Sequence, residues 1–199
     1  MEERPLARGV EKRQRFSRIF SLGDRKNTKS RSPGIILGPD DPSLPVSIAP
    51  FLSKRDTSTL PASISITTRG NFCYPFEDKE TWISKEGLVL PPSLAESDSG
   101  IFSSGSEVVL VSWQSLHHDA KLNKTELEPS IIVLVDAPQL VKSKELLINA
   151  IDIIRRKFPS SLLWTPGIGG PDNCSLLSWL GVDLFDLSRS RNAAAAGVM

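Results

Sequence analysis

The chain has 199 residues, of which 39% are hydrophobic and 24% are charged, and its formal net charge is +1. This composition is typical of one globular domain and excludes a wholly disordered chain or two large domains. A near-neutral chain has no long-range attraction for nucleic acid. No apolar run approaches the roughly 20 residues that span a bilayer, so we expect no membrane association.

The N-terminal segment is strongly basic. We expect residues 1–30 to form an irregular, partly disordered segment that is either solvated or in contact with RNA phosphates, and residues 31–199 to form one α/β domain. Sparse apolar residues would allow a short amphipathic helix from about Gly9 to Leu22. Acidic residues at positions 2, 3 and 11 argue against a transit peptide. The basic residues are Arg4, Arg8, Lys12, Arg13, Arg15, Arg18, Arg25, Lys26, Lys29 and Arg31.

Cysteine and histidine are scarce. Cys73 and Cys174 are far apart in the sequence, and neither has a second ligand at metal-binding spacing, which favours a reduced, cytoplasmic compartment. His117 and His118 are adjacent, so their side chains diverge and chelate one ion poorly. We therefore expect no metal site and no cofactor.

The first half of the chain shows few regular elements. Prolines interrupt residues 27–56 and leave short extended pieces at Gly34–Leu37 and Val46–Ala49. Alternating apolar and polar residues predict a half-buried strand at Ala62–Thr68. Asn71–Leu94 reads as a long loop or an inserted hairpin.

The hydrophobic pattern of the sequence changes after residue 107. Val108–Trp113 is a largely continuous apolar run, and so is Ile131–Val135, which is followed by Asp136. Such runs are typical of parallel strands that are covered on both faces. Helical periodicity over Leu140–Phe158 then predicts an amphipathic helix that ends at Pro159.

The last third alternates strand, helix and strand. A strand at Leu162–Trp164 leads into a glycine-containing loop and a short helix, with Asp172 or Asn173 as N-cap and Gly181 as the C-terminal stop. Val182–Phe185 is the next strand, and Asp186 follows it. This βαβαβ order predicts either a barrel or an open doubly wound sheet.

Asp186 is the main candidate for chemistry. Active sites of α/β barrels lie at the carboxyl ends of their strands, which is where this carboxylate falls. Two alternatives stay open: an Asp at a strand end is often structural, and a glycine loop before a helix is a common phosphate cradle. Asp183, three residues earlier, points to the opposite face and is expected to cap or brace the rim of the sheet.

Three stretches resemble the tRNA-guanine transglycosylase superfamily, whose archaeal members include archaeosine tRNA-ribosyltransferase and archaeosine synthase. The residues that carry the resemblance are the loop Thr165–Pro171, the strand Gly181–Asp186 and the stretch Arg189–Ala193, where Ser190 stands in place of the family's Thr. The segment Ile131–Asp136, with the helix after it, is most similar to the N-terminal barrel of archaeosine synthase.

The resemblance implies a TIM-type (β/α)8 barrel, complete or incomplete, and assigns roles to residues. Asp186 would be the nucleophile that displaces guanine and holds tRNA as a ribosyl ester. Asp98, in Asp98–Ser103, would recognise or protonate the base, although Ser103 replaces the family's Gln and the segment also reads as an ordinary turn. The residues expected to bind substrate are Gly167, Gly169, Gly170, Asp136 and Arg191.

The resemblance also implies partners. They are tRNA, guanine or a 7-deazaguanine base, and a partner chain or further copy that supplies the family's zinc and RNA-binding domains. If active, the chain would be a pentosyltransferase in archaeosine biosynthesis. The alternative is a non-catalytic barrel that binds or positions tRNA for a partner subunit.

Overall fold

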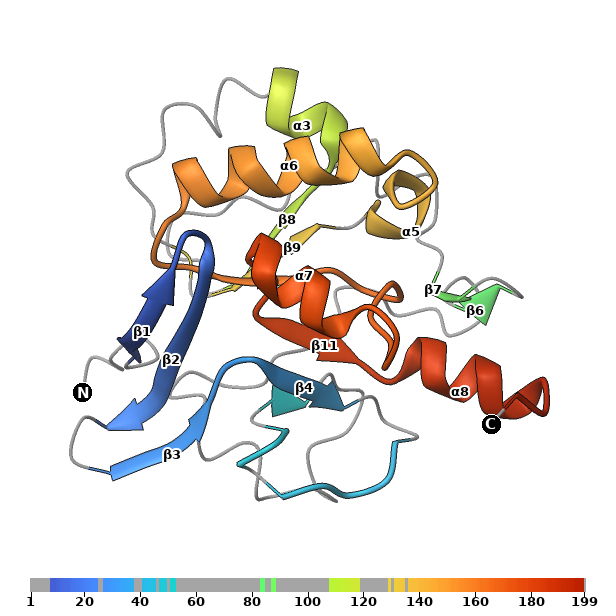
Figure 1. Cartoon of the computed structure of the whole chain (residues 1–199), viewed down its shortest axis with the longest axis horizontal. Coiled ribbons are helices and arrows are strands. Elements are labelled where there is room, and N and C mark those ends of the chain that lie inside the picture. The colour runs from blue at the N-terminus through green and yellow to red at the C-terminus, as the bar shows by residue number, and fades with distance from the viewer. Residues whose placement is uncertain are drawn as a thin grey trace.

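A computed structural model describes residues 8–24, 27–37, 41–45, 47–49, 51–52, 83–84, 87–88, 108–118, 129, 131–134 and 136–198. Its centre is a six-stranded sheet in the order β5-β4-β11-β10-β9-β8, in which every neighbouring pair is parallel (Figure 1). The strands are β4 (Gly34–Leu37), β5 (Phe51–Leu52), β8 (Val108–Val111), β9 (Ile131–Leu134), β10 (Leu162–Trp164) and β11 (Leu184–Asp186). The parallel α/β class predicted for the second half of the chain is confirmed.

The strand order brings distant parts of the chain together. The last strand, β11, pairs with the first strand of this sheet, β4, so that Phe185 lies opposite Ile35. A (β/α)8 barrel has the same cyclic order, with its last strand beside its first. Between β5 and β8 only residues 83–84 and 87–88 are described, so the barrel stays a prediction.

Helices that contribute to one core cover one face of the sheet: α3 (Trp113–His118), α5 (Ala137–Leu140), α6 (Lys144–Lys157) and α7 (Cys174–Leu180). A further helix, α8 (Ser188–Ala195), follows β11 and extends away from the sheet (Figure 1). Buried side chains of α6 and α7 pack with alternate residues of β9 and β10 in one core that includes Ile132, Leu163, Ile151, Ile154 and Leu177. Among the residues that the structure describes, no helix is both long enough and apolar enough to cross a bilayer.

The local signals around α7 predicted its ends. Asn173 is the N-cap, and Gly181 is the C-cap at a φ of 113°, a conformation that glycine adopts without a steric penalty. The strand at Leu162–Trp164 is confirmed, and the helix expected before Pro159 is α6. The last strand begins at Leu184, not at Val182, and it includes Asp186.

The helix expected over Gly9–Leu22 is wrong. A three-stranded antiparallel sheet stands there, made of β1 (Arg8–Gln14), β2 (Ser17–Asp24) and β3 (Asn27–Arg31), so these residues are regular where an irregular segment was expected. Along β2, Arg18, Phe20 and Leu22 are buried and alternate with less buried residues, which is the period of a strand. Arg18 is buried together with Phe20 and Leu22, which fits the two-residue period of a strand and not the 3.6-residue period of a helix.

Four other expectations fall in the first half. Gly34–Leu37 is a strand as predicted, whereas residues 47–49 form a turn in which the amides of Ile48 and Ala49 donate to the carbonyl of Pro45. Within the segment expected to be a loop or hairpin, β6 (Ile83–Ser84) and β7 (Gly87–Leu88) pair as antiparallel strands. The strand expected at residues 62–68 lies outside the described residues.

Candidate functional site

Polar side chains gather at the carboxyl edge of the parallel sheet. Ser112 follows β8, Asp136 follows β9, Thr165 follows β10, and Asp186 ends β11, while Asp41 lies beyond the end of β4. All except Asp136, which is half-buried, are buried. Because parallel strands point the same way, these groups share one edge, where α/β proteins bind ligands.

Asp186 is held by three N–H donors. Its Oδ2 accepts hydrogen bonds from the indole Nε1 of Trp164 at 3.1 Å and from the backbone N of Gly167 at 2.8 Å, and its Oδ1 accepts one from the backbone N of Ser188 at 2.9 Å. The residue is only 8% exposed. Bonds of N–H groups to a carboxylate are strong and directional, so this carboxylate has one fixed orientation.

The glycine loop delivers one of those donors. Gly167 has a φ of 73°, which turns its N–H toward Asp186 at no steric cost. Gly169 and Gly170 permit close packing: a Cβ on Gly169 would lie 2.5 Å from Cδ1 of Phe185, and one on Gly170 would lie 3.1 Å from Nη1 of Arg189. The loop is therefore shaped around Asp186, Phe185 and Arg189.

Three of the amides that a phosphate cradle would use are engaged within the loop itself. The N–H of Gly170 donates to Oδ1 of Asn173 at 2.8 Å, and the N–H groups of Asn173 and Cys174 both donate to the carbonyl of Gly170. A cradle needs such amides to point at the ligand. The geometry favours a loop that is closed on itself.

Asp136 carries a buried oxygen without a hydrogen-bond partner. Its Oδ2 accepts from the backbone N of Trp113 at 2.9 Å, while its Oδ1 is buried and finds no hydrogen-bond partner among the described residues. Burial raises the pKa of Asp136 above its ordinary value, and the bond from Trp113 offsets part of that rise. An unsatisfied buried carboxylate oxygen is costly, which marks Asp136 as a candidate for ligand contact.

Arg191 is engaged in an ion pair. Its Nη1 lies 2.9 Å from Oδ1 of Asp41, whose side chain is fully buried, whereas Arg191 itself is partly exposed. The pair links α8 to the segment that follows β4. Next to it, Arg189 bonds Asp172 at 2.7 Å and holds the pKa of that carboxyl below its ordinary value.

Two hydroxyl groups at this edge were not singled out from the sequence. Thr165 Oγ1 and Ser188 Oγ are buried and find no hydrogen-bond partner in the described parts of the chain. Thr165 comes directly after β10, and Ser188 lies two residues after the end of β11. The sequence could place both residues near strand ends, but it could not show that their hydroxyl groups are buried. Asp98 lies outside the described residues, so its role in recognising or protonating the base stays a prediction.

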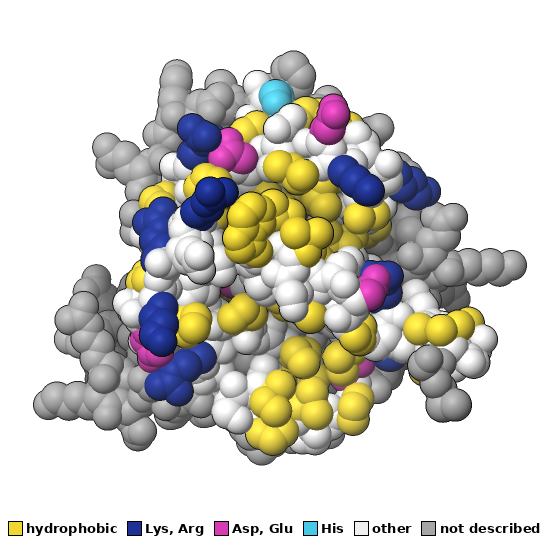
Figure 2. Space-filling model, viewed as in Figure 1, with side chains coloured by type: hydrophobic (Ala, Val, Ile, Leu, Met, Phe, Trp, Pro, Cys, Tyr) yellow, Lys and Arg dark blue, Asp and Glu magenta, His cyan; other side chains and the backbone are white. Residues whose placement is uncertain are grey.

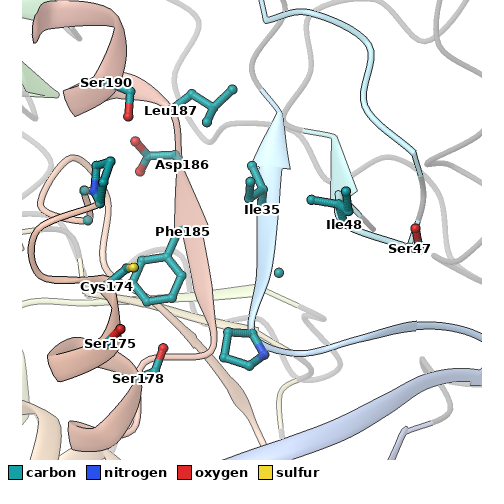
Figure 3. A pocket seen from close by; sticks show the side chains of 15 residues that line it. Ile35, Ser47, Ile48, Cys174, Ser175, Ser178, Phe185, Asp186, Leu187 and Ser190 are labelled. Carbon is teal, nitrogen blue, oxygen red and sulfur yellow. The ribbon is translucent and has the colours of Figure 1, made fainter. Parts of the chain in front are cut away.

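A groove of about 630 Å³ runs beside the edge on the helix-covered face. Figure 3 shows Cys174, Ser175 and Ser178 on one side, Ile35, Ser47 and Ile48 on the other, and Phe185 between them. Asp186, Gly169 and Gly170 also line the groove. The groove therefore meets the polar edge at β11.

A buried ionic cluster lies at the opposite, amino end of the sheet. Asp183 Oδ2 accepts from Arg155, from Arg18 at 3.4 Å and from the backbone N of Leu163 at 2.9 Å. Burial lowers the pKa of Arg155 to about 10, even though the charge of Asp183 opposes that shift, so Arg155 is protonated at neutral pH. The expected brace at Asp183 thus joins β2, α6, β10 and β11, and stands apart from Asp186.

Comparisons with models of protein families, with curated proteins and with solved structures give no match to this chain. The resemblance to the tRNA-guanine transglycosylase superfamily rests on the quoted residues alone.

Proposed function

We propose that this chain is a barrel domain of the tRNA-guanine transglycosylase type, which modifies tRNA in 7-deazaguanine (archaeosine) biosynthesis in the cytoplasm. One observation carries the proposal. Asp186 ends the strand that pairs with the first strand of the sheet, and it stands at the carboxyl edge with an oriented, buried carboxylate. This is the position and the residue type that the resemblance assigns to the nucleophile.

In the proposed reaction, an oxygen of Asp186 attacks the ribose C1′ of a guanosine in tRNA. The C1′–O bond forms as the bond from C1′ to the base breaks, and the departing guanine takes the electron pair and a proton. A ring nitrogen of the 7-deazaguanine then attacks C1′ and gives up its proton to the carboxylate of Asp98, the proposed donor of the proton to guanine, while the C1′–O bond breaks and its electron pair returns to Asp186. A carboxylate suits an oxocarbenium-like transition state because it stabilises the cation and captures it.

The N–H groups around Asp186 have a defined part in this scheme. Trp164, Gly167 and Ser188 aim the carboxylate before attack, and they stabilise its negative charge when the ester breaks. Asp136, Arg191 and the loop glycines are the proposed substrate contacts, and Asp98 is the proposed second acid.

Asp186→Asn tests the proposal. The wild-type chain should exchange radiolabelled guanine into tRNA and give a covalent tRNA adduct that survives denaturing electrophoresis, and Asp186→Asn should give neither. Asp172→Asn is the matched control, because Asp172 is an exposed carboxylate near the same loop. An adduct that persists in folded Asp186→Asn would overturn the assignment.

A second function is favoured by the same hydrogen bonds. Three N–H donors and 8% exposure also suit a purely structural carboxylate that fixes the glycine loop. The chain would then be a non-catalytic subunit that binds or positions tRNA for a partner chain. In that case wild type forms no adduct, and tRNA binding of Asp186→Asn equals that of wild type once the variant is shown to be folded.

A further inference from the structure

Among the described residues, no helix lies next to α7 over β11 and β4. α6 and α7 pack in sequence over β9, β10 and β11, and each follows the strand that precedes it in the chain. The next helix, α8, follows β11 but extends away from the sheet (Figure 1). Over β11 and β4, the described residues leave the 630 Å³ groove. Parallel sheets are normally covered on both faces, so this surface calls for a cover.

The groove has an apolar floor and a wall of small side chains. Ile35 and Phe185 form the floor from the paired strands β4 and β11, and Ile48, 49% exposed, stands on the far side. The wall from α7 carries only Cys174, Ser175 and Ser178. Small side chains let a second helix axis approach to the usual 8–10 Å.

Apolar side chains continue outside the groove. Leu176 and Trp179 on α7 are 59% and 46% exposed. Figure 2 shows hydrophobic side chains gathered over α7 and, below them, a second gathering across the groove. Exposed apolar side chains on both sides of the groove favour an interaction site here.

Positive charge stands at the carboxyl end of α7, where Trp179 lies. The guanidinium of Arg15, in the β1–β2 turn, lies 5.6 Å from the centre of the Trp179 ring, and Lys12 and Arg13 are exposed beside it. None of these three has a carboxylate partner among the described residues. An acidic group on a ligand would complement this end.

Two other kinds of occupant fit less well. An added β-strand needs a free sheet edge, but β4 and β11 are each paired on both sides. Single-stranded RNA needs several stacking platforms along a basic path, whereas the described residues that line this groove include one aromatic ring, that of Phe185, and no Lys or Arg.

We propose that the groove docks one amphipathic helix of a partner protein, laid beside α7 as the next member of the helical layer. Bulky apolar side chains on its inner face fill the space above Ile35 and Phe185. Acidic side chains lie at its end beside Arg15. The inference does not rest on glycosyl chemistry at Asp186, but Asp186, Gly169 and Gly170 line the same groove, so the docked helix would lie next to the proposed substrate contacts.

Site-specific photocrosslinking in cells of the native host tests the proposal. A benzophenone side chain replaces Ile48 in one variant and Ile148 in a control, since Ile148 is similarly exposed, at 46%, but lies on α6 outside the groove. The Ile48 position should crosslink to one protein, through a segment with an apolar stripe and acidic residues at one end. Crosslinks to RNA, to a second copy of this chain, or equally from both positions would overturn it.

Point variants check the geometry with the crosslinked segment as a synthetic peptide. Ile48→Asp should weaken its binding by about tenfold or more, and Ile148→Asp should leave it unchanged. Arg15→Glu should weaken binding most at low salt, because its contribution is electrostatic. Unchanged affinity in both Ile48→Asp and Arg15→Glu would reject the groove as the docking site.

Discussion

The indole of Trp164 donates a hydrogen bond to the carboxylate of Asp186 across two neighbouring strands, at 3.1 Å. Trp164 has no exposed surface, so water does not compete for this bond. The bond joins the largest buried side chain of the sheet to the main candidate residue, which makes the orientation of Asp186 dependent on core packing.

Trp164→Phe removes that donor and part of the ring. We expect a loss of about 2–4 kcal/mol in the free energy of unfolding, from the lost bond to a charged group and from the cavity that remains. Trp179→Phe, at an exposed indole, should change stability by less than about 0.5 kcal/mol. A double-mutant cycle with Asp186→Asn isolates the bond in urea unfolding, and a coupling energy near zero would show that the bond contributes nothing.

Asp183→Asn removes the only carboxylate of the buried cluster. Arg18 and Arg155 would then face each other without a countercharge, and we expect the free energy of unfolding to fall by about 3–5 kcal/mol. Asp152→Asn is the matched control. Because Asp152 pairs with Arg156 at the surface, this change should alter the free energy of unfolding by less than about 0.5 kcal/mol. Equal midpoints in thermal unfolding would refute the brace.

Asp136→Asn should stabilise the protein at neutral pH. Because burial raises the pKa of Asp136 in the folded state, the folded protein binds the proton more tightly than the unfolded chain does, and the free energy of unfolding falls as pH rises through that pKa. Asn removes the charge and keeps an acceptor for Trp113. The gain should therefore be largest at pH 7 and shrink toward pH 4.

Asp172→Asn gives the opposite trend as a control for that pH series. Arg189 lowers the pKa of Asp172, so its contribution is present at neutral pH and is lost as pH falls. Urea unfolding from pH 4 to pH 7 measures both variants. A pH-independent difference between Asp136→Asn and wild type would contradict the burial argument.

Gly181→Ala should be more harmful than Gly197→Ala. Both glycines have positive φ, but a Cβ at Gly181 would also meet Arg155 Nε at 3.0 Å and Phe16 Cβ at 3.1 Å, whereas Gly197 has nothing within 4 Å. We expect the free energy of unfolding to fall by about 2–3 kcal/mol in Gly181→Ala and by at most about 1 kcal/mol in Gly197→Ala. Similar values in chemical denaturation would show that backbone strain alone acts at Gly181.

Elements with local signals were predictable from the sequence. The strand Leu162–Trp164 is a short apolar run, and α7 has its N-cap at Asn173 and its stop at Gly181. The β1–β2 hairpin was not predicted because the spacing of its apolar residues suits both a helix and a strand. The strand is favoured by contacts of Arg18 with groups such as the carbonyl of Ser161, which lies more than 140 residues away in the sequence.

The site was predictable only at its centre. Asp186 was readable as a carboxylate at a strand end, but the donors that hold it come from another strand and from a loop. The sequence suggested that Gly169 leaves room for a ligand, whereas the ring of Phe185 lies against it. Contacts of this kind depend on the register between β10, β11 and β4, which no local pattern encodes.

The bonds from Arg18 to the carbonyls of Pro159 and Ser161 and to Asp183 have a consequence for the order of folding. The hairpin is made early in synthesis, yet its buried arginine finds its acceptors only after the segment around residue 183 has left the ribosome. β4 likewise cannot pair with β11 until β11 has been synthesised. Such long-range closure slows folding, so the first strands of this protein stay open to other partners until its last strand arrives.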